Sequence, residues 1–481
     1  MTHRVEGESK SMTNHARTTV SIPEAALTKM AGRLVGRVFR PGKEGFAEAT
    51  LIWNGMIEKR PGAVVQVASV GDVVETVNLA RDHGLELSIK GGGHNIAGLA
   101  LSDGGVTLDF SQMRGVEVDV SAGTVVVQPG CTLGDVDRAT QESGLVVALG
   151  FVSETGVAGL TLGGGFGYLA RQIGYTVDEL LEVELVTATG DVIRASREHN
   201  EDLFWAVRGG GGNFGVVTEF VFRTHEVGPE VTAGLIVWSA DEAEAVTDLF
   251  RRVTESAPRQ LTMAMLMRNA PPAPWLAEKH HGKPMIAFVV CHTGTPEEAE
   301  ADLAEVRSHG DPWADIIQVK DYVAQQSMLD ATQPKGMHYY WKSEFVPELS
   351  DGLLRDYRAQ FVGLEAPANQ IVLFHLEGAL ARFEEDDGAV GNRDAAYACV
   401  IQAMHPEGGP AEANRQWVRS AWSTLKKYST GGNYINFQTD DETDDRTAES
   451  YRANLERLQM IKAKYDPDNL FRVNRNIRPQ S

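Results

Sequence analysis

The sequence predicts an α+β fold of two or three domains, not one regular parallel α/β sheet. With 481 residues, the chain exceeds the roughly 100 to 200 residues of an ordinary domain. Up to about residue 228, short strands and helices alternate irregularly. From Pro229 the order becomes strand, helix, strand, strand, helix, with longer elements. This second pattern indicates an antiparallel sheet with helices on one face.

In the first part, capping residues and β-rich runs define the expected elements. Ser69 and Asp72 form an S-x-x-D capping box for a helix that stops at Gly84. A strand over residues 85–90 then runs directly into three glycines. The other elements expected here are strands over residues 106–109, 116–120 and 124–128 and a helix that begins at Thr132.

In the second part, residues 232–238 and 285–291 alternate like half-buried strands. Thr295, followed by Pro296, caps a helix. Residues 339–345 and 370–376 are expected to complete one sheet whose free face covers a pocket.

One helix is expected near the C-terminus, from Tyr451 through Ile461, and the tail after Pro467 is expected to dock back onto the core. The predicted organisation is a tail and lead-in helix (1–50), a first domain (51–228), a second domain (229–440) and a C-terminal segment (441–481).

Composition excludes several classes of function. The net charge of -21 disfavours nucleic acid and anionic membranes as partners. No apolar run of about 18 residues is present, and the first twenty residues lack the apolar core of a signal peptide. We therefore expect a soluble, cytoplasmic protein. Cys131, Cys291 and Cys399 form neither a disulfide framework nor a CxxC pair, and the adjacent His280 and His281 are not spaced as metal ligands, so no metal is expected.

Three glycine clusters carry the strongest functional signal. Gly91 to Gly93, followed by His94, expose backbone N–H groups that can bind a pyrophosphate, although an ordinary glycine-rich turn explains this loop equally well. A second cluster spans residues 156–174 and a third spans 205–220. The second contains G-x-G-x-x-A, the fingerprint of NAD-binding Rossmann units, but no buried strand precedes it, so we reject that interpretation.

In order, KGGGHN, GVAGLTLGGGFG, DLFWAVRGGGGNFGVVTEF and a terminal YDPDNLF resemble the berberine-bridge-enzyme-like FAD-linked oxidases of the vanillyl-alcohol-oxidase superfamily. The resemblance covers residues 60–224 and 431–479. It implies a two-subdomain PCMH-type FAD-binding domain, a substrate-binding domain built on an antiparallel sheet, and a C-terminal segment that returns to the FAD domain.

The resemblance also implies site residues. His94 matches the histidine bonded covalently to the flavin, whereas Val152 stands where many relatives have a second, cysteinyl link, so one covalent bond is expected. Cys131 is read as a packed thiol. The other residues expected to bind FAD are Lys90, Gly91, Gly92, Gly93, Asn95, Gly98, Gly156, Val157, Gly159, Leu160, Gly163, Val216, Tyr434, Asn474 and Asn476.

The resemblance also implies an aromatic or acidic residue above the flavin ring, and Tyr434, at the matching tyrosine-x-asparagine motif, is the first candidate for the catalytic base, with a core tyrosine as the alternative. On the expected strands, His375 pairs with Glu377, and Tyr340 with Lys342, as further candidates to line the pocket, although each residue taken singly is more often structural.

The function these features predict is oxidation of a small alcohol, sugar, amine or secondary metabolite, with covalent FAD reoxidised by oxygen to give hydrogen peroxide. A dehydrogenase with another acceptor, a non-catalytic flavin-binding protein and an NAD-dependent enzyme are the alternatives. The expected state is a monomer or homodimer. The substrate stays open because the pocket depends on the divergent second domain.

Overall fold

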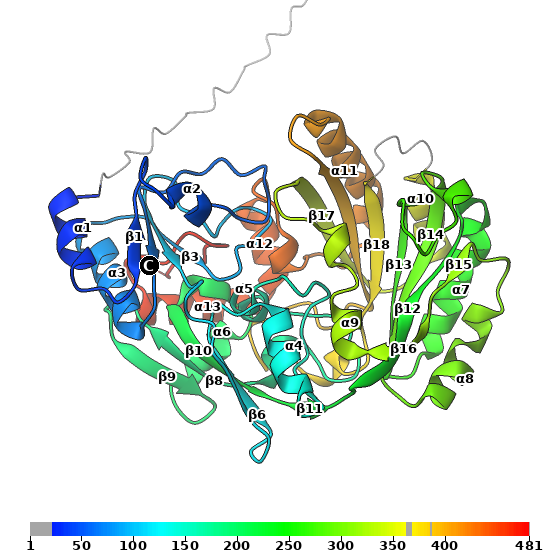
Figure 1. Ribbon diagram of the computed structural model, residues 1–481, viewed down its shortest axis with the longest axis horizontal. Helices are drawn as coiled ribbons and strands as arrows, with labels where there is room; N and C mark the ends of the chain where they lie inside the picture. Colours follow the sequence, from blue (N-terminus) through cyan, green and yellow to red (C-terminus); the bar gives the residue numbers. More distant parts are fainter. Residues whose placement is uncertain (1–21, 362–367, 385–386, 481) are drawn as a thin grey trace, which may run out of the picture.

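The computed structural model describes residues 22–361, 368–384 and 387–480 (Figure 1). Its first layer is a sheet in the order β1-β2-β4-β3, in which β2, β4 and β3 run parallel and β1 is antiparallel. Its elements are α1 (Glu24–Ala31), β1 (Arg37–Phe39), α2 (Phe46–Ala49), β2 (Ala63–Gln66), α3 (Val70–Asp82), β3 (Leu87–Lys90) and β4 (Val106–Asp109).

The predicted capping box at α3 forms only in part. Ser69 Oγ accepts a hydrogen bond from the Asp72 N–H at 3.2 Å. The Asp72 carboxylate, however, accepts from the N–H groups of Val35, Gly36 and Ala68. Asp72 therefore fastens the segment before β1 to the start of α3, a tertiary role that the local pattern did not predict.

A five-stranded antiparallel sheet in the order β5-β6-β10-β8-β9 follows in the described residues. Its strands pack with α4, α5, α6 and the C-terminal helices around one apolar cluster that includes Phe204, Phe214 and Phe220. The elements are β5 (Val116–Asp119), β6 (Thr124–Val127), α4 (Leu133–Gln141), β7 (Leu145–Val146), α5 (Val157–Leu162), β8 (Leu180–Val186), β9 (Val192–Ser196), α6 (Glu201–Val207), β10 (Val216–Arg223) and β11 (His225–Glu226), where β7 pairs with β11.

The second part is an antiparallel sheet for which the described residues supply eight strands, in the order β15-β12-β14-β13-β18-β19-β17, with β16 beside β12. Helices α7, α8, α10 and α11 cover one face (Figure 1). The bounds are β12 (Glu230–Ser239), α7 (Ala243–Ser256), β13 (Leu261–Asn269), β14 (Pro284–His292), α8 (Pro296–Arg307), β15 (Ala314–Asp315), β16 (Gln318–Asp321), α9 (Tyr322–Gln326), β17 (His338–Val346), α10 (Asp351–Ala359), β18 (Gln370–His375), β19 (Tyr397–His405) and α11 (Ala411–Leu425).

Strand alternation divides the side chains of this large sheet between two environments. On β13, Met263, Met265 and Met267 face the helices and belong to the main apolar cluster. Ala264, Leu266 and Arg268 lie between them and face the opposite side, toward the glycine-rich part of the chain. The face that carries no helices therefore covers a pocket, as the sequence pattern predicted.

The C-terminal segment differs from the predicted single helix. It forms α12 (Asp444–Tyr451) and α13 (Asn454–Tyr465), separated at Arg452, whose φ of 48° interrupts the helix. Tyr451 ends α12, whereas Leu458 and Ile461 lie on α13 and pack into the cluster beneath the five-stranded sheet. None of the described helices is both long and apolar enough to span a membrane.

Candidate active site

The glycine loops and the free face of the eight-stranded sheet enclose a cavity of about 390 Å³. This size is within the usual range for ligand sites, about 300 to 1,000 Å³. Three stretches, 91–95, 156–163 without Val157 and Thr161, and 211–215 without Phe214, form one wall. The alternate residues of β13, β14, β18 and β19 form the other, and residues 473–475 of the tail close one end.

Glycine is required in the first wall for two different reasons. A Cβ atom on Gly92 would lie 2.5 Å from Gly156 Cα, so the first two glycine loops can touch only without side chains. A Cβ on Gly159 would meet nothing within 4 Å, and one on Gly212 only Ile89 at 3.9 Å. These two positions face open space, which leaves room for a flat group against the backbone.

His94 is held at the edge of this wall by a stack of aromatic rings. Its imidazole lies 4.3 Å from the Trp53 ring with an interplanar angle of 17°, and Tyr339 covers the other face of Trp53 at 3.7 Å. Trp53 Nε1 donates a 2.9 Å hydrogen bond to the Gln333 carbonyl. His94 Nε2 is buried and has no hydrogen-bond partner. Burial lowers the pKa of His94 to about 4, so its ring is neutral near pH 7.

The segment around Trp53 also joins the two parts of the chain through the backbone. Trp53 N–H donates to Gly93 O, Gly336 N–H donates to Trp53 O, and Gly55 N–H donates to Met337 O, each at 2.9 Å. The Asn54 side chain accepts from the Tyr339 N–H at 3.1 Å. We refer to these contacts as the Trp53 seam. No local pattern predicted the seam, because its partners lie some 280 residues apart.

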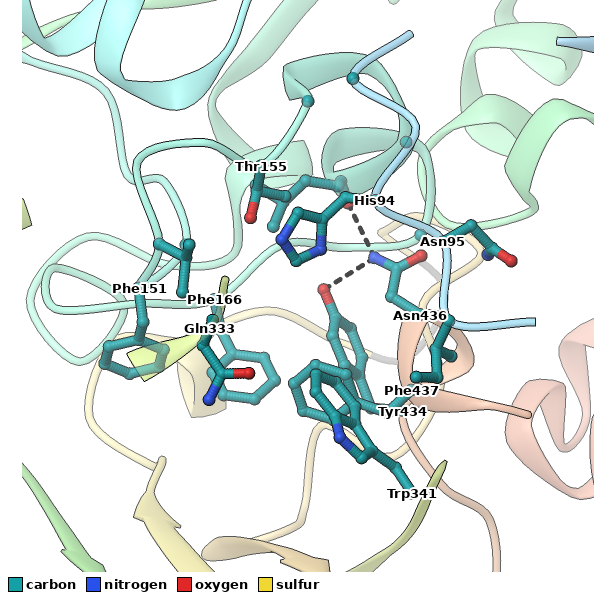
Figure 2. A pocket seen from close by; sticks show the side chains of 18 of the residues that line it. His94, Asn95, Phe151, Thr155, Phe166, Gln333, Trp341, Tyr434, Asn436 and Phe437 are labelled. Carbon is teal, nitrogen blue, oxygen red and sulfur yellow. Dashed lines mark hydrogen bonds between the residues drawn. The ribbon is translucent and has the colours of Figure 1, made fainter. Parts of the chain in front are cut away.

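Tyr434 presents a hydroxyl group whose acceptor capacity is already used. Its oxygen accepts hydrogen bonds from the Gly165 N–H at 2.8 Å and from Asn436 Nδ2 at 2.9 Å. Figure 2 shows Asn436 beside this hydroxyl, and Asn436 Nδ2 also donates to the Leu160 carbonyl at 3.1 Å. Both lone pairs are occupied, so the hydroxyl proton is free to contact a ligand. Burial raises the pKa of Tyr434 to about 12, although the two donors oppose this rise.

The lining of the cavity contains no aspartate or glutamate among the residues that the structure describes. Its charged side chains there are Arg268 and Arg475. The chain as a whole carries 66 acidic and 45 basic residues. The cavity is therefore electropositive within an acidic protein, which favours anionic groups.

Most residues predicted to bind FAD line this cavity. They are Gly91, Gly92, Gly93, His94, Asn95, Gly156, Gly159, Leu160, Gly163, Tyr434 and Asn474. The Asn474 side chain donates to the carbonyls of Gly212 and Phe471, and its buried oxygen has no partner.

Five predicted residues lie behind the wall. Lys90 donates to the Ala49 carbonyl and pairs with Asp109, so its side chain does not reach the cavity. Val216 is buried in the core beneath it, whereas its neighbours Gly215 and Val217 line the cavity. Also outside the lining are Gly98, Val157 and Asn476.

The other three catalytic candidates do not line the cavity either. His375 has the same parity on β18 as Ile371 and Leu373, which face the helices. Its Nε2 lies 2.8 Å from Arg171 Nη1 and 2.9 Å from Glu377 Oε2, so His375 and Glu377 do meet, but in a polar cluster away from the cavity.

Tyr340 is likewise on the helix side of β17. Its hydroxyl donates to Asp441 at 2.6 Å, and Lys342 binds the same carboxylate at 2.8 Å. The neighbouring Trp341, of opposite parity, lines the cavity instead (Figure 2). Tyr340 and Lys342 share a face as expected, but it is the opposite face of the sheet, and Glu377 lies beyond the end of β18.

Cys131 matches its predicted role as a packed thiol. Val152 lines the cavity, whereas Cys131 is fully buried in the cluster beneath the five-stranded sheet, with Sγ 3.4 Å from the Gly115 carbonyl. Burial raises the pKa of Cys131 to about 12. Cys291 and Cys399 are also buried and lie outside the cavity lining.

The residues present fit FAD. The glycine wall leaves its backbone exposed to a pyrophosphate and an isoalloxazine ring, and His94 Nε2 and Asn474 Oδ1 are buried without partners. Residues 61–196 match the family model of an FAD binding domain, and residues 433–478 match the model described as berberine and berberine like.

Two curated relatives match almost the full length of the chain. An FAD-linked oxidoreductase of Dictyostelium discoideum is 31% identical over 92% of this chain and 95% of the relative. The (R)-6-hydroxynicotine oxidase of Paenarthrobacter nicotinovorans is 31% identical over 92% of this chain and 97% of that enzyme.

Solved structures share the same fold. The crystal structure of 6-hydroxy-D-nicotine oxidase from Arthrobacter nicotinovorans matches with a TM-score of 0.82 and 29% identity, over 93% of this chain and 98% of that chain. A chitooligosaccharide oxidase matches with a TM-score of 0.84 and 22% identity, over 95% of this chain and 100% of that chain. By its sequence, its fold and its glycine-walled cavity, the chain belongs to the berberine-like family of FAD-linked oxidoreductases.

Proposed function

We propose that the chain is an oxidase that removes a hydride and a proton from a small organic substrate, at a carbon bearing a hydroxyl or amino group. The single observation that carries this proposal is the continuity of the cavity, which runs from His94 past the Tyr434 hydroxyl to the free face of the large sheet. FAD, when bound, supplies the hydride acceptor, and oxygen takes the two electrons and two protons to give hydrogen peroxide. Relatives named as oxidases of hydroxynicotine and of chitooligosaccharide support this reaction class.

In this proposal, His94 holds the flavin through one covalent bond. Its ring is neutral near pH 7, its buried Nε2 has no competing partner, and the Trp53 ring fixes its plane. Val152 offers no thiol for a second link, and no described cysteine lines the cavity.

Tyr434 handles the proton of the substrate heteroatom. With Gly165 and Asn436 donating to its oxygen, the hydroxyl donates its own proton and so orients the substrate oxygen or nitrogen. No carboxylate lines the described cavity, so the ionised form of Tyr434 is also the acceptor when the heteroatom loses its proton. Because burial raises the Tyr434 pKa to about 12, the ionised fraction is small at neutral pH and increases tenfold with each pH unit.

The test is anaerobic mixing of the purified, FAD-loaded protein with separate panels of alcohols, amines, sugars and aromatic secondary metabolites. A substrate bleaches the flavin, and readmitted air restores its colour with one hydrogen peroxide formed for each substrate consumed. Bleaching without reoxidation by air would instead identify a dehydrogenase. A protein that binds FAD but is bleached by no panel would contradict the proposal.

A further inference from the structure

Arg268 places a positive charge in the substrate half of the cavity without a neutralising partner. It lies on β13, and its side chain lines the cavity. Nε donates to the Asn269 carbonyl at 3.2 Å and Nη1 donates to Gln370 Oε1 at 3.4 Å, and both acceptors are neutral. Within residues 22–361, 368–384 and 387–480, the structure shows no ion pair between Arg268 and a carboxylate.

Arg475, the other arginine of the lining, is a useful contrast. Its guanidinium donates to the carbonyls of Gln438 and Thr439, and the carboxylates of Glu442, Asp440 and Asp441 raise its pKa against the lowering by burial. Burial alone lowers the pKa of Arg268, with no opposing carboxylate. A guanidinium has five N–H donors, and two hydrogen bonds to neutral oxygens leave most of them for a ligand. A desolvated charge of this kind is costly unless a ligand compensates it.

Three glutamines extend this polar group across the sheet. Gln370 Nε2 donates to Gln402 Oε1 at 2.8 Å, and Gln402 Nε2 donates to Gln333 Oε1 at 2.8 Å. Arg268 can only donate hydrogen bonds, so the side-chain oxygen of Gln370 must point toward it. This orientation sets the donor-to-acceptor direction of all the hydrogen bonds between the three glutamines. This row of hydrogen bonds ends at Gln333, whose amide nitrogen is another donor at the cavity; Figure 2 shows the Gln333 side chain.

The remaining surface around Arg268 is apolar. The side chains of this half are Leu235, Leu266, Pro271, Trp275, Met285, Ala287, Val289, Val372, Phe374 and Val400. Such a surface offers few hydrogen bonds to the many hydroxyl groups of an oligosaccharide. It suits a compact hydrocarbon or aromatic body.

We infer that the substrate is a compact apolar molecule with a carboxylate, which Arg268 binds while the oxidised carbon lies toward Tyr434 and the flavin. The inference rests on the proposed oxidase function of this cavity. The planar guanidinium can engage both oxygens of a carboxylate at once. One arginine, with no lysine in the described lining, compensates one negative charge and so suits a carboxylate better than a doubly charged phosphate monoester.

The test measures binding, not turnover. Isothermal titration calorimetry of the FAD-loaded protein compares isosteric pairs: phenylacetate with phenylacetamide, benzoate with benzamide, and cinnamate with cinnamamide. A charge-assisted hydrogen bond predicts that at least one carboxylate binds about 10-fold or more tightly than its amide. In Arg268→Met this preference should fall to about onefold, and in Arg268→Lys part of it should return. Arg252→Met, on the exposed side of α7, is the matched control and should keep the wild-type preference.

The outcomes separate the two proposals. If no carboxylate of the panel binds more tightly than its amide, or if Arg268→Met keeps the preference, the inference is wrong, even in a protein that is bleached by substrate and forms peroxide. If carboxylates are preferred through Arg268 but no panel bleaches the flavin, the anion site stands and the oxidase proposal fails. The flavin spectrum of each variant verifies that it is folded and loaded.

Discussion

Replacement of His94 by alanine tests the covalent bond that we propose between His94 and the flavin separately from the stability of the fold. The substitution removes the stack between His94 and Trp53, whose ring centroids are 4.3 Å apart. Such aromatic pairs contribute about 0.5 to 1.5 kcal/mol. Nε2 makes no hydrogen bond, and the side chain borders an open cavity, so its loss leaves neither an unpaired partner nor a closed void. We expect the unfolding free energy to fall by only about 1 kcal/mol, while the covalent bond is lost completely.

The assay is acid precipitation followed by flavin absorbance of pellet and supernatant, with the intact mass of the denatured chain measured in parallel. Wild type should keep its flavin in the pellet and exceed the polypeptide mass by one FAD. His94→Ala should bind FAD when native but release it into the supernatant. His83→Ala, an exposed histidine at the end of α3, should behave like wild type.

Two results would refute this reasoning. If wild type releases its FAD on denaturation, there is no covalent bond to His94. If His94→Ala retains the mass of FAD, another residue carries the link. A large loss of stability in His94→Ala would show that the side chain supports the fold beyond its stack with Trp53.

The remaining predictions concern four other positions. Tyr434→Phe should slow flavin reduction by a substrate about 10² to 10⁴-fold with intact FAD binding, measured by anaerobic stopped flow, and an unchanged rate would remove Tyr434 from the reaction. Trp53→Leu should increase the fraction of FAD released by acid, because His94 loses the ring that orients it; complete retention would argue against that role. Val152→Cys combined with His94→Ala should restore some covalently bound flavin, because residue 152 lines the cavity; a mass equal to the bare polypeptide would show that residue 152 does not reach the flavin. Burial lowers the pKa of His375 from 6.5 to about 4. Between these two pH values the unfolded chain therefore binds more protons than the folded chain. Stability should therefore fall by on the order of 3 kcal/mol as the pH drops through this range, and urea unfolding of His375→Gln should lack most of this dependence.

The local patterns of the sequence predicted many elements correctly. Strand β4 has the predicted bounds, and α8 begins after the predicted cap Thr295, where the structure shows a full capping box with Glu298. Strand β13 was predicted only by its place in the order of elements, without bounds, because residues 263–267 are apolar on both faces and so lack alternation. The split at Arg452 was also missed, since an arginine with positive φ has no local signature.

The candidate site could be predicted on its cofactor side and much less on its substrate side. The glycines and His94 are contiguous in the sequence, so short motifs identify them. On the sheet, the face that each residue occupies depends on which side the helices cover, and a single sequence does not reveal this. Tyr340 and Lys342 were therefore expected to line the pocket, whereas Trp341, the residue between them, lines it instead. Arg268 was not predicted as a site residue.

The Trp53 seam restricts where a molecule can enter or leave the cavity. Two main-chain hydrogen bonds join Trp53 and Gly55 to residues 336 and 337, the Asn54 side chain binds Tyr339, and together they hold the histidine side of the cavity closed. Separation of the two parts of the protein at this point would break these hydrogen bonds together and would separate the stacked rings of Trp53 and Tyr339. A molecule that enters or leaves the cavity must therefore pass at some distance from the Trp53 seam. The end of the flavin that His94 is proposed to hold would then lie against a rigid part of the protein, and any opening movement would occur at the opposite rim.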